Sequence, residues 1–312
     1  MKYIIDNTSS INKALIKCKD GDILFLKNGL YKEKVEIYNN NITIVGESKN
    51  MVIISNKDFY HKIMSDYNEC NTFRTYTLYV GGNNITIENL TIENTATPSV
   101  KYGQAVSLHV DGNNFKGNNL IIRSAQDTLF TGPMPSDLIE RYKGFHLDSH
   151  LKGNPSKQIY SNCLIIGDVD FIFGSATALF YKCEIHSLNN SYNKFEPNGY
   201  CCAPSHSIDN KFGYLFYKCN FSCDEGASRV YLARPWRDYG NAAFIDSIYG
   251  SHIVPEGFHN WNGTNRDKTA RFYEYSDRYD LSRRVNWATI LDEIEKEKYL
   301  KEYFSFIDFK EI

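Results

Sequence analysis

Several features that would point to a membrane, nucleic-acid or secreted protein are missing from this sequence. No apolar run reaches 18 residues, so we expect no membrane-spanning helix. The apolar stretch at the start, Tyr3-Ile4-Ile5, is much shorter than the roughly 7–15 residues of a secretory signal. We therefore expect a cytoplasmic location if Met1 is the native start, and secretion if a leader was removed. The formal net charge is only −2, which gives no reason to expect nucleic acid or an anionic membrane as a partner.

Cysteine is also scarce, with eight residues in 312. This is well below the roughly 8–10% typical of a disulfide scaffold. Five potential metal ligands cluster in sequence (Cys201, Cys202, His206, Cys219 and Cys223), but the Cys-x-x-Cys spacing of zinc sites is absent. We favour buried apolar thiols over a metal site and expect no metal or other cofactor.

Aromatic residues and asparagine, in contrast, are abundant: 14% of the chain is aromatic, with 23 Tyr, and there are 31 Asn. Short alternating segments follow Asn-rich turns at 39–44, 82–87 and 112–115. A second group of similar segments occurs at 159–164, 180–185 and 216–221. Loose repetition of short strands predicts a solenoid of stacked coils, with an antiparallel sandwich as the alternative. Asn suits such coils because it tolerates left-handed turns and its amides can form ladders.

A solenoid needs caps at its ends. A helix at about 9–18, begun by Ser9 or Ser10, would place Ile11, Ala14, Leu15 and Cys18 on one face. A helical tail at about 287–304 would carry a stripe of Trp287, Ile290, Leu291 and Ile294, with the charged run 295–298 as its solvated face. The length would allow two domains, but no segment resembles a linker. We therefore interpret 1–312 as a single all-β domain.

Four segments are more polar than strand formation requires: 102–106, 126–130, 167–174 and 233–237. In the third, Asp170 lies between Val169 and Phe171-Ile172-Phe173. A carboxylate is costly to bury there unless something pairs with it. Each segment alone is equally consistent with a buried polar contact between coils, but the four together indicate a site.

These segments resemble the signatures of the pectin methylesterases (pectinesterases), and they occur in the family order. The matching residues are Gly103-Gln104-Ala105-Val106, Gln126-Asp127-Thr128-Leu129, Val169-Asp170-Phe171-Ile172-Phe173-Gly174 and Arg234-Pro235-Trp236. The resemblance extends from Gly29 to about Tyr275. It implies a single-stranded right-handed parallel β-helix, which is more specific than the repeats alone could show.

The resemblance also implies roles in the hydrolysis of galacturonate methyl esters. Asp170 matches the nucleophile, held ionised by Arg234, and Asp127 matches the general acid, its pKa raised by the neighbouring carboxylate. Gln126, assisted by Gln104, matches the oxyanion-stabilising amides. Substrate contacts are expected from Trp236, Phe173, Phe130, Val169 and Tyr239. The implied partner is pectin or a methylated oligogalacturonide, and we expect a monomer.

Two departures from the family pattern stand out. Asp127 and Asp170 are 43 residues apart, roughly twice the usual separation, because of an inserted loop at about 131–157. We hypothesise that the insertion flanks the substrate cleft and affects which ester pattern or chain length is accepted. Its Asp137, Glu140, His146, Asp148 and His150 could form a site, although solvated loop residues are the simpler interpretation. The second departure is His109, where the family commonly has Arg, and we assign it no catalytic role.

Other functions remain open at the level of sequence. A Ser-His-Asp esterase is disfavoured because Gly-x-Ser-x-Gly is absent. A glycoside hydrolase on a β-helix could use two aspartates, but the Gln and Arg neighbours suit an acyl oxyanion better than an oxocarbenium ion. A lyase would need a calcium-binding carboxylate cluster, and none is well spaced. A non-catalytic carbohydrate-binding solenoid, or an esterase or thioesterase for another substrate, completes the alternatives.

Overall fold

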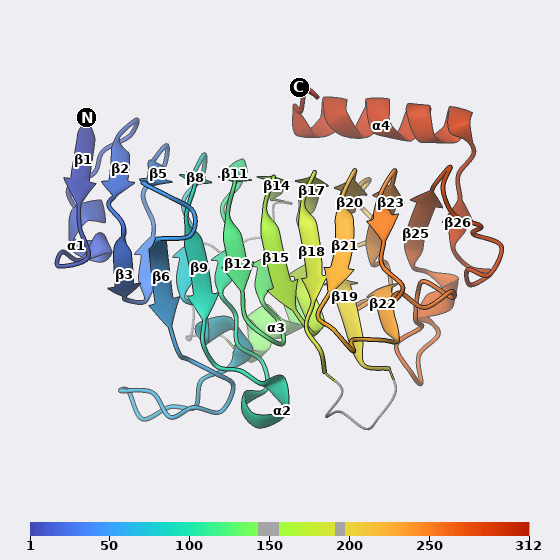
Figure 1. The fold of residues 1–312 in the computed structure, drawn as a ribbon, viewed down its shortest axis with the longest axis horizontal. Coiled ribbons are helices and arrows are strands. Elements are labelled where there is room, and N and C mark those ends of the chain that lie inside the picture. Colours follow the sequence, from blue (N-terminus) through green and yellow to red (C-terminus); the bar gives the residue numbers. More distant parts are fainter. Residues whose placement is uncertain (143–155, 191–196, 312) are drawn as a thin grey trace.

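The computed structural model describes residues 1–142, 156–190 and 197–311. Within them the chain forms a right-handed parallel β-helix, in which successive coils contribute parallel strands to three sheets (Figure 1). Every pairing between named strands is parallel, so the antiparallel sandwich is excluded and the predicted fold class is confirmed. No helix in the described parts is both long and apolar enough to cross a membrane.

The three sheets run along the length of the stack. Sheet A contains β1 (Lys2–Ile5), β2 (Ile23–Leu26), β5 (Thr43–Gly46), β8 (Thr86–Glu88), β11 (Phe115–Asn118), β14 (Lys157–Ser161), β17 (Thr177–Tyr181), β20 (Tyr214–Tyr217), β23 (Asn241–Ile245), β25 (Arg271–Tyr275) and β26 (Thr289–Ile290). Sheet B contains β3 (Gly29–Lys32), β6 (Val52–Asn56), β9 (Thr91–Asn94), β12 (Ile121–Arg123), β15 (Leu164–Gly167), β18 (Glu184–Ser187), β21 (Asn220–Cys223) and β24 (Ile248–Tyr249). Sheet C contains β4 (Val35–Ile37), β7 (Leu78–Val80), β10 (Leu108–Val110), β13 (Leu129–Thr131), β16 (Val169–Gly174), β19 (Gly199–Pro204) and β22 (Val230–Ala233).

Asparagine ladders hold the turns of successive coils in register. Asn41, Asn84 and Asn114 all have left-handed φ values, between 55° and 57°. The Nδ2 of Asn84 donates to Oδ1 of Asn41 at 2.8 Å, and the Nδ2 of Asn114 donates to Oδ1 of Asn84 at 3.0 Å. The ladder predicted from the Asn-rich turns is therefore confirmed, and each amide serves both the backbone conformation and the stacking.

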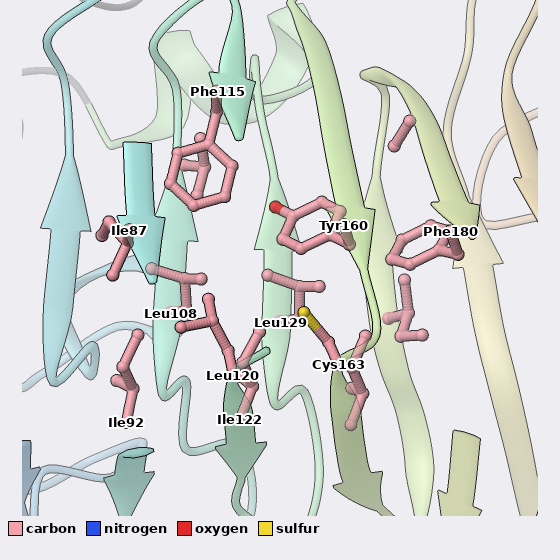
Figure 2. Packing of buried hydrophobic residues seen from close by; sticks show 14 of the residues in the cluster. Ile87, Ile92, Leu108, Phe115, Leu120, Ile122, Leu129, Tyr160, Cys163 and Phe180 are labelled. Carbon is pink, nitrogen blue, oxygen red and sulfur yellow. The ribbon is translucent and has the colours of Figure 1, made fainter. Parts of the chain in front are cut away.

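The interior of the stack is filled by columns of equivalent side chains (Figure 2). Tyr160, Phe180, Phe216 and Phe244 form one such column, with ring centroids 4.6–5.0 Å apart and interplanar angles of 9°. All eight cysteines are free thiols, and all but Cys223 are buried. The interpretation of the thiols as buried apolar groups therefore fits the structure, with Cys223 partly exposed.

The N-terminal helix closes the first coils, although it is shorter than predicted. Helix α1 (Ile11–Leu15) begins at Ser10, whose Oγ accepts a hydrogen bond from the Lys13 N–H. The Asn12 side chain makes the hydrogen bonds that the backbone of a neighbouring strand would make. Its Oδ1 accepts from the Glu36 N–H at 3.0 Å, and its Nδ2 donates to the Lys34 carbonyl at 2.8 Å. The helix therefore covers the open edge of sheet C at β4.

The prediction for the C-terminal helix is wrong in its start and in its buried face. Helix α4 (Glu293–Ile307) begins after Asp292, which forms a capping box with Glu295. The Ile294 side chain is 80% exposed, and the buried face of α4 is Lys296, Leu300, Tyr303 and Ile307. The charged run is also not wholly solvated, because Lys296 is buried and its Nζ pairs with Glu293 at 2.8 Å.

The helix does not cover the end of the stack either. Figure 1 shows α4 returning along sheet A from β26 towards β14. Its Tyr303 packs on Phe212 and donates to the Gly213 carbonyl at 2.9 Å. Trp287 instead closes the core, because it packs against Phe272 of β25 with ring centroids 5.6 Å apart. The other helices in the described residues are short: α2 (Ser99–Tyr102), α3 (Ser136–Arg141) and the 3₁₀ turns η1 (Thr72–Arg74) and η3 (Arg266–Lys268).

Candidate active site

The four polar segments found in the sequence meet at one cavity of about 500 Å³ on the outer side of sheet C. They meet because neighbouring strands of that sheet come from successive coils. Gln104 precedes β10, Gln126 and Asp127 precede β13, Asp170 lies in β16 and Arg234 follows β22. All five line the cavity, together with Phe173 and Trp236.

A β-bulge directs Asp170 into the cavity. The pairing of β16 with β19 shifts register between Val169 and Ile172. Asp170 takes a left-handed conformation there, with φ of 50°. As a result Phe171 and Ile172 both join the interior core, while Asp170 stays on the outer side. This explains how a carboxylate is accommodated in so apolar a strand.

Arg234 neutralises Asp170 through two parallel hydrogen bonds. Its Nε donates to Oδ1 at 2.8 Å and its Nη2 donates to Oδ2 at 2.6 Å. The guanidinium is itself held between two rings, 3.7 Å from the Tyr200 centroid and 4.0 Å from the Trp261 centroid. Arg234 is thus fixed as the charged partner of Asp170.

Asp127 lies in a different electrostatic environment from Asp170. It is only 8% exposed, and burial raises its pKa well above the ordinary value. The nearby Asp170 carboxylate raises that pKa further, while Arg234 opposes the shift. Its backbone N–H donates to the Val169 carbonyl at 3.1 Å, and its φ is 62°. The site therefore combines an ion-paired carboxylate with a carboxyl group that tends to hold its proton.

The two glutamine amides face the same cavity from adjacent coils. Gln104 and Gln126 form an isolated parallel bridge. The Tyr60 N–H donates to the Gln104 carbonyl at 3.0 Å, which secures this segment from the other side. Within the described residues neither side-chain amide makes a hydrogen bond, so both can donate to a bound group.

Aromatic rings form the walls of the cavity, but not all of those predicted. Phe173 and Trp236 line it, with ring centroids 5.6 Å apart. The prediction that Phe130 contacts a sugar is wrong, because this side chain is 0% exposed. Phe130 lies behind the wall, where it packs on Phe173 and on His109.

Val169 and Tyr239 are not among the described residues that line the cavity. The Val169 carbonyl accepts the hydrogen bond from Asp127, and the Tyr239 carbonyl accepts one from Arg271 at 2.9 Å. Val169 therefore supports the site through its backbone, whereas Arg271, the partner of Tyr239, does not line the cavity. His109 is buried below the wall, where its Nε2 lies 3.1 Å from Oδ2 of Asp111.

Sequence reasoning missed several residues of the cavity because no motif marks them. Tyr60, Phe73 and Trp261 line it, and Tyr200 supports Arg234 from beside it. They come from connections, from β19 and from the 3₁₀ turn η1, none of which carries a local signature of chemistry. The excess of aromatic residues was the only available signal, and it does not distinguish a wall of the cavity from the core.

The described part of the insertion borders the cavity, as hypothesised. Helix α3 contributes Leu138 and Arg141, and Tyr142 follows them. Asp137 is not a free site residue, because its carboxylate pairs with Arg237 at 2.8 Å. Of the other insertion residues considered, Glu140 does not line the cavity, and His146, Asp148 and His150 lie outside the described residues.

Comparison with known families identifies the chain's relationship. The model of the Pectinesterase family matches residues 5–134 and 144–308. The chain belongs to the pectinesterase family. One curated pectinesterase relative, the pectinesterase/pectinesterase inhibitor PPE8B of Prunus persica, is 30% identical over 301 residues, which is 90% of this chain and 51% of that protein. The chain spans about half the length of the curated relatives that it matches.

Solved pectinesterase structures share the fold over almost the whole chain. The pectin methylesterase from Yersinia enterocolitica superposes with a TM-score of 0.76 at 26% identity, covering 93% of this chain and 96% of its own. A pectin methylesterase in complex with a hexasaccharide gives a TM-score of 0.76 at 22% identity, covering 96% and 95%.

Proposed function

We propose that this chain hydrolyses methyl esters of galacturonate residues in pectin or methylated oligogalacturonides, releasing methanol and a free carboxylate. The observation that carries the proposal is the pair of aspartates in one cavity. Asp170 is ion-paired with Arg234, while the pKa of Asp127 is raised by burial and by Asp170. Membership of the pectinesterase family and the hexasaccharide bound to a relative of the same fold support the choice of substrate.

In the first half-reaction, an Oδ atom of Asp170 attacks the ester carbonyl carbon. The carbonyl oxygen becomes an oxyanion, which accepts hydrogen bonds from the amides of Gln126 and Gln104. When this intermediate collapses, the bond to the methoxy oxygen breaks and Asp127 gives its proton to that oxygen. Methanol leaves, and the substrate acyl group remains bound to Asp170 as an anhydride.

In the second half-reaction, Asp127 is a carboxylate and acts as the base. It takes a proton from water while the water oxygen attacks the same acyl carbon. The bond between that carbon and the Asp170 oxygen breaks, which releases the galacturonate carboxyl group. Asp170 returns to its ion pair with Arg234, and Asp127 is protonated again. Every step thus uses a residue that lines the cavity.

The insertion supplies part of the cleft, and we propose that it influences which ester pattern or chain length is accepted. Leu138 and Tyr142 add apolar surface, while Arg141 adds a positive charge. An apolar surface favours a methylated residue, and a cation favours a free carboxylate. The balance between these contacts would set the preference for the neighbouring sugars.

Methanol release from highly esterified pectin tests the proposed function. We expect methanol without new reducing ends and without the absorbance of an unsaturated product. Reducing ends alone would indicate a glycoside hydrolase, and a new double bond would indicate a lyase. The variants Asp170→Asn and Asp127→Asn should each lose at least about 100-fold in kcat. The exposed Asp209→Asn is the matched control and should keep wild-type turnover. Full turnover in either active-site variant would refute the assignment.

A further inference from the structure

A third buried aspartate, Asp168, lies next to the site and has no part in the reaction proposed above. Its residue exposure is 1%, and burial raises its pKa, while hydrogen bonds from Ser99 and the Val169 N–H oppose that shift. It lies in the connection between β15 and β16, two residues before Asp170. A carboxyl group buried this deeply needs a structural or functional reason.

The backbone of Asp168 is fixed by the coils on both sides. Its N–H donates to the Ala125 carbonyl at 3.0 Å, immediately before Gln126 in sequence. Its carbonyl accepts from the Tyr200 N–H at 3.1 Å, and Tyr200 is one of the rings that hold Arg234. The backbone of Asp168 is therefore held between the coil that carries Gln126 and the coil that carries Tyr200.

The side chain of Asp168 also binds a third segment, the one that begins at Ser99. Its Oδ1 accepts from the Val169 N–H at 2.7 Å, which fixes the carboxyl orientation. Its Oδ2 accepts from the Ser99 hydroxyl at 2.5 Å, across 69 residues of sequence. Ser99 is itself buried, so this contact is shielded from water and is correspondingly strong.

The position of Ser99 affects Gln104, because only the rest of α2 and Gly103 separate the two residues along the chain. It is the first residue of α2, and its carbonyl accepts from the Gly103 N–H at 2.7 Å. Gly103 has φ of 68°, so the chain turns sharply before it enters Gln104. The position of the Gln104 amide therefore depends on where Ser99 is held.

We propose that Asp168 is a positioning residue that sets the place of the Gln104 amide relative to Asp170, through its hydrogen bond to Ser99. This inference rests on the proposed function for its kinetic consequence, but not for its structural one. An amide displaced by about 1 Å would still allow substrate to bind but would stabilise the oxyanion less, because such electrostatic contacts require accurate placement. The loss should therefore be in kcat and not in KM.

Four variants test the proposal against wild-type protein in the methanol-release assay. Asp168→Ala and Ser99→Ala should each lower kcat about 10-fold or more, with KM within about twofold. Asp168→Asn should stay within about threefold of wild type, because its amide oxygen can accept from the Val169 N–H and its amide nitrogen can donate to the Ser99 oxygen. The double variant Asp168→Ala/Ser99→Ala should be no worse than Asp168→Ala alone, because Ser99→Ala removes only a hydrogen bond that Asp168→Ala has already removed.

Hydrogen exchange gives a readout that is independent of activity. Amides of residues 99–105 should exchange faster in Asp168→Ala and Ser99→Ala than in wild type and in Asp168→Asn. Wild-type kcat in Ser99→Ala, additive losses in the double variant, or an Asp168→Asn as impaired as Asp168→Ala would each overturn the proposal. If the wild-type protein releases no methanol, the proposed function fails, and the exchange result then decides the structural part alone. If Asp168→Ala does not fold, Ser99→Ala provides the same test.

Discussion

The two aspartates of the site lie in different electrostatic environments because of their immediate neighbours. Asp170 has Arg234 as a bidentate partner, whereas Asp127 is buried close to a negative charge. Both adopt left-handed backbone conformations, which are costly for residues with a Cβ. Such strain persists only where the surrounding structure enforces it. At this scale the site depends on a few contacts that specific substitutions can remove.

The Arg234 guanidinium should be irreplaceable even by another cation. In Arg234→Lys we expect kcat to fall by about 100-fold or more, since an ammonium group cannot donate in parallel to both Asp170 oxygens or stack between two rings. Steady-state methanol release measures the effect. Arg266→Lys is the matched control, because Arg266 also lies over Trp261, at 5.6 Å, and is not bonded to Asp170. Equal losses in the two variants would contradict the assignment.

The proton on Asp127 should make stability depend on pH. Since the folded-state pKa of Asp127 is above its unfolded value, this group costs the folded state stability as pH rises above about 4, until the folded pKa is reached. Asp127→Asn removes that cost, so the variant should gain stability over wild type between pH 4 and pH 7. A gain of about 1 kcal/mol would raise Tm by about 1.5 °C, because the entropy of unfolding grows with chain length.

Thermal melts at pH 4 and pH 7 measure this difference. Asp209→Asn should show no such pH-dependent gain, since Asp209 is exposed. A constant difference between Asp127→Asn and wild type at both pH values would show that Asp127 ionises normally in the folded protein.

Among the secondary-structure elements, helix α3 lies in the stretch between residues 134 and 144 that the family model does not match. Helix α3 belongs to the insertion and is joined to the segment after Trp236 by the Asp137–Arg237 ion pair. It also presents Arg141 to the cavity, and within the described residues Arg141 forms no ion pair. This element is therefore where the proposed effect of the insertion on substrate preference can be tested.

Replacing Arg141 should alter substrate preference and leave the chemistry intact. Arg141→Gln should raise KM for weakly esterified pectin by up to about fivefold, which corresponds to the roughly 0.2–1 kcal/mol of an exposed ionic contact. KM for highly esterified pectin should change less, and kcat should be retained. The exposed Lys298→Gln of α4 is the control for a general loss of positive charge. A uniform change of KM on both substrates would argue against a carboxylate contact at Arg141.

Element boundaries also show what local sequence could and could not reveal. Ser10 is a readable start for α1, because a capping serine is followed by apolar residues at helical spacing, Ile11, Ala14 and Leu15. The sequence prediction begins α4 too early, because Trp287 and Ile290 match a helical stripe by chance, whereas the Asp292–Glu295 capping box marks the observed start. The burial of Lys296 differs from the prediction for another reason: it depends on the strands that α4 packs against, which no local pattern records.

At the scale of the whole molecule, repetition made the fold predictable and the details of the site less so. Asn turns and alternating strands indicated stacked coils, and the four polar segments indicated one site. The β-bulge at Asp170, the two rings around Arg234 and the Ser99–Asp168 contact all join residues from different coils. Such contacts depend on how the coils register in space, so sequence motifs pointed to the catalytic candidates but not to their support.

The aromatic column should contribute strongly to the stability of the second half of the stack. Phe216 is fully buried between Phe180 and Phe244. Phe216→Ala should therefore lower the free energy of unfolding by about 3–5 kcal/mol. Urea denaturation followed by circular dichroism measures this. Tyr67→Ala, at a side chain that is 91% exposed, should change it by less than about 0.5 kcal/mol. A similar small change at Phe216 would mean that the coil relaxes around the missing ring.

The parallel stacking of sheet C has a further consequence for how such a site can evolve. Neighbouring strands are about 4.8 Å apart, so the active-site groups can be displaced along the axis only in whole steps of that length. Gaining or losing a coil between β16 and β22 would carry Arg234 one step from Asp170 and abolish a contact of 2.6 Å. Connections such as 131–157 face no such restriction. The spacing of the active-site residues along the axis can therefore change only by whole coils, whereas the length of the connections can change by single residues. Such a change would preserve the proposed reaction while the residues around the substrate diverge.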